Sequence, residues 1–165
     1  MVVGRIPFII RLIMPILWYG LIFYLTELPA ASSDNTSSSV KQATAPLFEA
    51  LSGQTLMPDE TNPIADVINA VFRIAAHIFV FGVLGLLFYF LIEPKMDFSF
   101  NKLLIVVFLI GLFGLSDEIH QSYVPGRHAA LLDVFKDMIG AILFVSAIGF
   151  LKLKYFSFKY DEPNK

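Results

Sequence analysis

The sequence predicts an all-α integral membrane protein, a four-helix bundle with a short extracytoplasmic surface helix. Of its 165 residues, 56% are hydrophobic and 16% are charged, whereas soluble domains average about 45–50% apolar and about 25% charged residues. Four apolar runs approach the length of about 20 residues that an α-helix needs to cross a bilayer. A chain of this length is expected to form a single domain over residues 1–165.

Charge and cysteine content exclude several classes of protein. The formal net charge is −2, and no basic stripe is present to neutralise phosphates, so no nucleic-acid partner is expected. The chain has no cysteine, which excludes a disulfide framework, a thiolate nucleophile and a cysteine-ligated zinc. The lipid bilayer is therefore the first expected partner.

The first predicted span covers residues 6–25. Its one charge, Arg11, lies near the start, where a long side chain can reach the membrane interface. Arg5 and Arg11, followed by an apolar stretch, also fit a cleaved signal peptide. We favour an uncleaved helix, because the run is rich in Trp and Tyr and is long enough to span.

Three further spans follow a long loop over residues 26–72. The second covers residues 74–92 and ends at Glu93-Pro94. The third covers 103–121 and the fourth covers 133–153. Counted by apolar residues alone, the last two are short. They reach spanning length when the polar segments beside them also enter the membrane region.

The long loop begins with a Ser-rich stretch, residues 32–39, which predicts a linker. Apolar residues then recur at helical spacing from Val40 to Leu51, and Gly53 follows as a stop signal. This pattern predicts a short helix on the membrane surface. A loosely ordered loop is the alternative.

A second helix signal closes the loop. Asn62 is a favoured N-cap residue and Pro63 suits the first helical position. No helix breaker separates this start from the second span. The pattern predicts one helix from Pro63 to Ile92, with its first two turns outside the bilayer.

Basic residues in short loops predict the orientation, because they concentrate on the cytoplasmic side. With four spans, eight of the twelve Lys and Arg residues fall on the side that holds both termini. We therefore expect a multi-pass protein of the plasma membrane with both termini in the cytoplasm. The eight residues are Arg5, Arg11, Lys95, Lys102, Lys152, Lys154, Lys159 and Lys165.

Polar residues concentrate at the outer ends of the predicted spans. Arg73 and His77 are four apart and share a helix face. Asp133 and Asp137 are also four apart, at the start of the fourth span. Ionisable groups at membrane depth are costly and usually face a bundle interior or a wet cavity. We expect one outer-leaflet site, with tentative catalytic residues Glu118, His120 and Asp137. Its candidate ligand-binding residues are Arg73, His77, Asp117, Gln121, Arg127 and Asp133.

Each candidate also has a plainer explanation. Arg127 could bind a phosphate or carboxylate, or could form an internal ion pair with Asp133, Asp137 or Glu118. Asp133 could be catalytic or could cap the fourth helix. His77 is better explained as a packing residue than as a ligand.

The third span raises the same choice. Glu118 and His120 could act as general base and acid, or could belong to a hydrogen-bond network that joins three helices. Asp117 could be a solvated charge at the interface. Gly82, Gly85 and Gly140 are expected to allow close helix packing.

A metal site is the less favoured explanation of these residues. Nitrogen and oxygen ligands suited to zinc, manganese or magnesium are present. However, the sequence has no local two-histidine signature, so we expect no metal and no cofactor. The potential ligands are His77, His120, Glu118, Asp133 and Asp137.

The same polar segments resemble the VanZ-like membrane proteins, a family named for a teicoplanin-resistance factor. The most specific segment is Ser116 to Gln121, followed by Val124 to Arg127. Leu132 to Val134 and Asp137 to Ala141 continue the likeness, and Arg73 to Gly85 is similar to an upstream family stretch. The resemblance implies a four-span envelope protein, sometimes linked to reduced susceptibility to glycopeptide antibiotics.

Three functions fit these observations. We favour binding or remodelling of an anionic cell-envelope component, either a lipid or a cell-wall precursor, at the outer leaflet. The alternative is a membrane-embedded hydrolase or transferase that acts on such a headgroup through Glu118 and His120. A small transporter is the weakest, because no inverted repeat or pair of broken helices is visible. The sequence does not identify the ligand or the oligomeric state.

Overall fold

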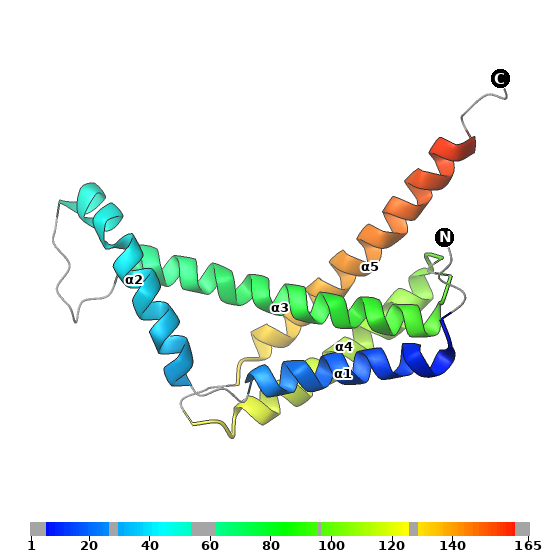
Figure 1. Ribbon diagram of the computed structural model, residues 1–165, viewed down its shortest axis with the longest axis horizontal. Coiled ribbons are helices and arrows are strands. Elements are labelled where there is room, and N and C mark those ends of the chain that lie inside the picture. The colour runs from blue at the N-terminus through cyan, green and yellow to red at the C-terminus, as the bar shows by residue number, and fades with distance from the viewer. Residues whose placement is uncertain (1–5, 27–29, 54–61, 96, 126–128, 161–165) are drawn as a thin grey trace.

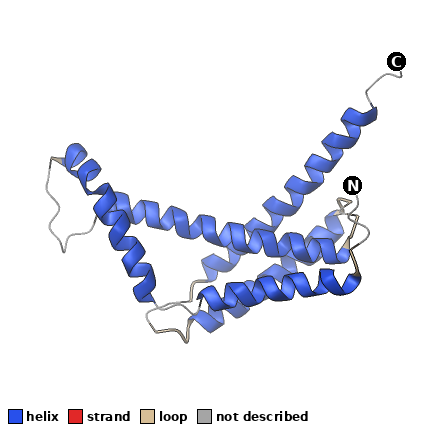
Figure 2. Ribbon diagram, viewed as in Figure 1, coloured by secondary structure: helices blue, strands red, loops and turns tan. Residues whose placement is uncertain are grey.

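Helices make up nearly all of the described chain in this computed structural model (Figures 1 and 2). The structure describes residues 6–26, 30–53, 62–95, 97–125 and 129–160. No strand occurs within those ranges, which confirms the all-α prediction. The helices are α1 (Phe8–Thr26), α2 (Ala30–Ser52), α3 (Pro63–Ile92), α4 (Phe100–Gln121) and α5 (Leu131–Tyr160).

Four of these helices are long and apolar enough to cross a membrane: α1, α3, α4 and the part of α5 from Leu131 to Leu151. Large apolar side chains cover their outer surfaces; Leu17, Phe108 and Phe150 are each more than half exposed. A water-soluble monomer rarely exposes so much contiguous apolar surface. The fold is therefore that of a multi-pass membrane protein, with this surface facing lipid.

The predicted start of α3 is confirmed in detail. Asn62 is the N-cap, and its Oδ1 accepts hydrogen bonds from the backbone N–H groups of Ile64 (3.1 Å) and Ala65 (3.3 Å). The Asn62 side chain also donates to Thr44 Oγ1 at 3.0 Å, which ties α2 to the start of α3. The same cap therefore begins one helix and anchors another.

Two helices are longer than the sequence predicts. The Ser-rich stretch 32–39 is not a linker, because α2 begins at Ala30 and is not short. Ser, Asn and Asp lower helix propensity only weakly, and an adjoining helix can extend through them. The end of α2 at Gly53 is as predicted, since Gly53 has a left-handed φ of 68°. At the other end of the chain, α5 continues to Tyr160.

The core lies between α3, α4 and α5, and α3 crosses α5 beside it (Figure 1). A Cβ on Gly85 would lie 2.8 Å from Ala141 Cβ, and a Cβ on Gly140 would overlap the Ile78 carbonyl oxygen. A Cβ on Gly82 would lie 2.6 Å from the Phe144 ring. Small residues at such positions let helices approach closely in membranes. The predicted packing role of these three glycines is confirmed.

Side-chain hydrogen bonds to backbone carbonyls help to hold α1 against α3 and α4. The Trp18 indole donates to the Val80 carbonyl at 2.8 Å, and the Tyr19 hydroxyl donates to the Phe113 carbonyl at 3.3 Å. Only Pro15 and Ile22 of α1 are buried. The helix therefore lies on the side of the bundle and leaves most of its surface for lipid.

The turn between α3 and α4 is tied together at the opposite end from the polar residues. The Tyr89 hydroxyl donates to the Asp97 carbonyl at 2.8 Å and accepts from the Ser99 N–H at 2.7 Å. Glu93 pairs with Lys102, and this hydrogen bond lowers the pKa of the Glu93 carboxyl below its ordinary value. These contacts fix α3 and α4 as neighbouring antiparallel helices.

Candidate functional site

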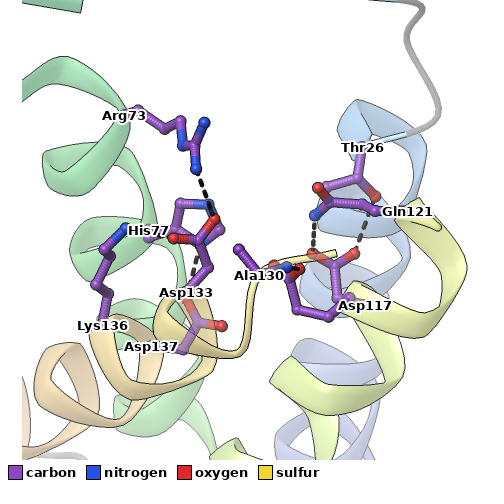
Figure 3. A network of polar contacts seen from close by, with 10 residues as sticks. Thr26, Arg73, His77, Asp117, Gln121, Ala130, Asp133, Lys136 and Asp137 are labelled. Atoms are coloured by element: carbon purple, nitrogen blue, oxygen red, sulfur yellow. Dashed lines mark hydrogen bonds and ion pairs between the residues drawn. The ribbon is translucent and has the colours of Figure 1, made fainter. Parts of the chain in front are cut away.

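One end of the bundle collects polar side chains from four helices (Figure 3). Helices α1 and α4 end there, while α3 passes through it at about its third and fourth turns and α5 in its first two turns. The contributing residues therefore lie far apart in the sequence and meet only in the fold.

His77 on α3 contacts two carboxylates on α5. Its Nδ1 lies 2.9 Å from Asp137 Oδ1, a hydrogen-bond distance, and its Nε2 lies 3.7 Å from Asp133 Oδ2. The His77 side chain is 15% exposed, and Asp137 is only 1% exposed. Gly114 makes room for this carboxylate, because a Cβ there would lie 2.7 Å from Asp137 Oδ2. His77 is thus a mostly buried histidine whose ring is hydrogen-bonded within the bundle.

Asp133 is the carboxylate with the most charged neighbours. Arg73 reaches its Oδ2 at 3.2 Å, and Lys136 from the next turn of α5 pairs with its Oδ1. Asp133 does not cap α5, as the sequence had allowed, because the helix already begins at Leu131. It lies inside the first turn, where an acidic side chain is favoured by the helix dipole.

A second group of hydrogen bonds joins α1 to α4. Asp117 accepts from the Thr26 hydroxyl at 2.9 Å and from the Gln121 amide at 2.8 Å, one at each carboxylate oxygen. Asp117 is 1% exposed. It is therefore a buried, fully hydrogen-bonded carboxylate, and its interpretation as a solvated interfacial charge is wrong.

Glu118 and His120 lie on different sides of α4. Glu118 is 2% exposed, and one of its oxygens accepts from the Ala130 N–H at 2.5 Å. The His120 ring stacks on Phe23 of α1, with 3.7 Å between ring centroids. An acid and base that act on one substrate atom must both reach it, and this arrangement separates them.

A cavity of about 170 Å³ lies between α1, α3 and α4. Its walls are mostly apolar, and its polar lining comes from Thr26, His77 and Asp117. Glu118 and Arg73 are not among the lining residues. The apolar lining residues are Ile22, Leu25, Ala76, Val80 and Phe81.

The structure brings most of the predicted site residues together. Arg73, His77, Asp133 and Asp137 form one network, and Asp117 with Gln121 forms the other. Arg127 lies outside the described residues, so its predicted ion pair or ligand contact stays a prediction.

Sequence reasoning missed three members of these networks: Thr26, Ala130 and Lys136. The spacing of Lys136 from Asp133 is a signal that could have found it, because residues three apart are neighbours on a helix. Thr26 lies in the segment from Tyr24 to Pro29, which is similar to the end of the first span in the VanZ-like proteins; no sequence signal identifies the Ala130 N–H.

Three of the five potential metal ligands also meet. Donor atoms of His77, Glu118 and Asp133 all lie within 4.8 Å of one another. Asp137 lies behind His77 and hydrogen-bonds its other ring nitrogen. His120, against Phe23, does not belong to this group.

Fold and site together define a multi-pass membrane protein with a buried ionisable cluster at one end of its helical bundle. Comparison with protein families gives the particular group: the VanZ/LLP1 family model matches residues 11–152. The chain therefore belongs to the VanZ/LLP1 family. No curated protein and no solved structure matches it.

Proposed function

We propose that this protein binds an anionic, lipid-like component of the cell envelope at the polar end of its bundle. The observation that best supports this proposal is the exposure of the Arg73 guanidinium. Its side chain is 65% exposed, although one guanidinium nitrogen contacts the buried Asp133. Among the described residues, Asp133 is the only hydrogen-bond partner of the guanidinium, so its remaining N–H groups are available to a phosphate or carboxylate.

The cavity supports an amphiphilic ligand over a purely soluble one. It offers apolar walls beside the polar groups of His77, Asp117 and Thr26. A cavity of about 150 Å³ is large enough to hold benzene, so this one can take a short hydrocarbon segment. A lipid or a lipid-linked cell-wall precursor would place its chain here and its headgroup on the outward edge of Arg73.

Binding explains the arrangement better than acid–base chemistry. A reaction centre needs its carboxylate, imidazole and cation around one open space. Here Asp133 and Asp137 pair with neighbouring side chains, and Glu118, the proposed acid or base, does not line the cavity. A hydrolase or transferase that uses Glu118 stays the second candidate, because Glu118 Oε1 is buried without a hydrogen-bond partner among the described residues.

The proposal includes a place in the cell. The basic residues near both termini favour an orientation in which the polar end lies on the outer side of the plasma membrane. An envelope precursor or an anionic outer-leaflet lipid would meet the site there. Reduced susceptibility to teicoplanin would then follow from altered handling of the envelope component that the antibiotic acts on.

A binding experiment with two arginine variants tests the proposal. Fluorescent phosphatidylglycerol is titrated into the detergent-purified protein, with phosphatidylcholine as the neutral comparison. Arg73→Gln should weaken binding of the anionic lipid about tenfold, or about 1.4 kcal/mol. Arg11→Gln is the matched control, because Arg11 lies at the opposite end and contacts the Leu91 carbonyl. Equal losses in both variants, or no preference for the anionic lipid, would refute the site.

A cellular assay separates the two candidate functions. Variants are expressed at equal levels in a teicoplanin-susceptible bacterial host, and the inhibitory concentration is measured. The binding proposal expects Arg73→Gln to lose any protective effect, while Glu118→Gln retains it. Loss in Glu118→Gln and His120→Gln, with Arg73→Gln unaffected, would favour the enzymatic alternative.

A further inference from the structure

Three donor atoms from three different helices meet in the polar cluster. They belong to His77 of α3, Glu118 of α4 and Asp133 of α5, and they lie within 4.8 Å of one another. We propose that these three side chains bind a divalent transition-metal ion. This differs from the expectation drawn from the sequence, which had no local metal signature.

The first argument comes from the hydrogen bond of His77. With its Nδ1 2.9 Å from Asp137 Oδ1, a neutral ring donates from Nδ1 and directs the lone pair of Nε2 toward Asp133. Metal-binding histidines almost always donate their second nitrogen to a carboxylate or carbonyl in this way. Asp137 is thus placed as the positioning residue behind a metal ligand.

The second argument is distance. His77 Nε2 and Asp133 Oδ2 are 3.7 Å apart, which is too long for a proton to join them in a good hydrogen bond. In a tetrahedral site with metal–ligand bonds of about 2.0–2.2 Å, neighbouring ligand atoms lie roughly 3.3–3.6 Å apart. The separation of the two atoms is therefore close to that of two ligands of one metal ion, and a donor oxygen of Glu118 lies within 4.8 Å of both.

The third argument is the unpartnered oxygen of Glu118. The residue is 2% exposed, and its Oε1 has no hydrogen-bond partner among the described residues. A buried carboxylate oxygen left in that state is costly. A metal ion between Glu118, His77 and Asp133 would satisfy it.

Charge also favours a bound cation. Among the described residues, three buried carboxylates, those of Glu118, Asp133 and Asp137, face two cations, Arg73 and Lys136. With His77 neutral, the network has one negative charge in excess. One nitrogen and two oxygen donors suit zinc or manganese, whereas calcium and magnesium prefer oxygen ligands throughout.

Zinc uptake by the full-length purified protein tests the inference without any lipid present. The protein is treated with EDTA, transferred to chelator-free buffer at pH 7 and titrated with zinc chloride in a calorimeter. Bound zinc is then measured after desalting. We expect one zinc per chain. Asp137→Asn should weaken binding about 10–100-fold, the usual effect of losing such a positioning carboxylate, and Glu118→Gln should weaken it at least as much.

Asp117→Asn is the matched control, because Asp117 is an equally buried carboxylate of α4 that pairs with Thr26 and Gln121. It should keep the wild-type affinity. Far-ultraviolet circular dichroism confirms that each variant is folded. The wild-type result is decisive even where a variant fails to fold: no saturable zinc uptake would mean that a proton on His77 balances the cluster. Equal affinity in wild type and folded Glu118→Gln would also overturn the inference.

Discussion

Two aspartates share the imidazole of His77, and the closer one, Asp137, is almost fully buried. Removing one partner of a buried hydrogen bond to a charged group typically costs about 1.5–3 kcal/mol. We therefore expect His77→Gln and Asp137→Asn each to lower the free energy of unfolding by about that amount. The double variant should lose clearly less than the sum. Reversible unfolding in mixed micelles measures all three.

A distant pair supplies the control for this cycle. Glu93 pairs with Lys102 at the other end of the bundle, so Glu93→Gln combined with His77→Gln should be additive within about 0.5 kcal/mol. If the effects of His77→Gln and Asp137→Asn are also additive, the hydrogen bond between His77 and Asp137 does not contribute to the free energy of unfolding.

The sequence could predict the faces of these residues but not their partners. Arg73 with His77, and Asp133 with Asp137, each have the spacing of one helical turn, which places each pair on one face. Which face meets which depends on the rotation and depth of α3 against α5. That is set by the packing of Gly140 on Ile78, a contact between residues 62 positions apart.

At the scale of the helices, the crossing of α3 and α5 is the tightest contact. Gly140→Ala would place a Cβ against the Ile78 carbonyl oxygen. Forcing atoms into a well-packed core typically costs about 1–3 kcal/mol, and we expect a loss of stability in that range. Thermal unfolding followed by circular dichroism measures it.

Gly20→Ala is the counterpart in α1, because a Cβ there meets nothing within 4 Å. Alanine in a helix interior is favoured over glycine by about 0.5–1 kcal/mol, so this variant should be as stable as wild type or more stable. A similar loss in both variants would show that glycine is needed for helix flexibility, and not for the crossing.

Helix boundaries were predictable where a cap marks them. Asn62 and Gly53 mark their ends correctly. The start of α2 could not be predicted, because the Ser-rich composition of residues 32–39 favours a linker, whereas the chain there is helical. Composition reports local preference, and a helix of this length is also supported by its contacts with α3, such as the bond from Asn62 to Thr44.

For the whole molecule, four spans place the start of α1 and the end of α5 on the same side. The concentration of basic residues on that side predicts that it lies in the cytoplasm. In this cysteine-free chain, a single Leu51→Cys should react with a membrane-impermeant maleimide on intact cells, since Leu51 is 74% exposed on α2. Lys95→Cys, between α3 and α4, should react only after permeabilisation. The reverse pattern would invert the topology and place the polar site inside the cell.

The alignment of α3 with α5 poses a problem that charge alone does not solve. Asp133 and Asp137 are one helical turn apart, as are Arg73 and His77, so sliding α5 by one turn would still give an acid opposite a base. The charge pattern is therefore similar before and after α5 is shifted by one turn, and it does not fix the alignment. Gly140 removes the ambiguity, because a one-turn slip would bring Lys136 or Phe144 against the Ile78 carbonyl, where even a Cβ does not fit. Opposite charges attract α3 and α5, whereas the absence of a side chain at Gly140 fixes the position of one helix along the other.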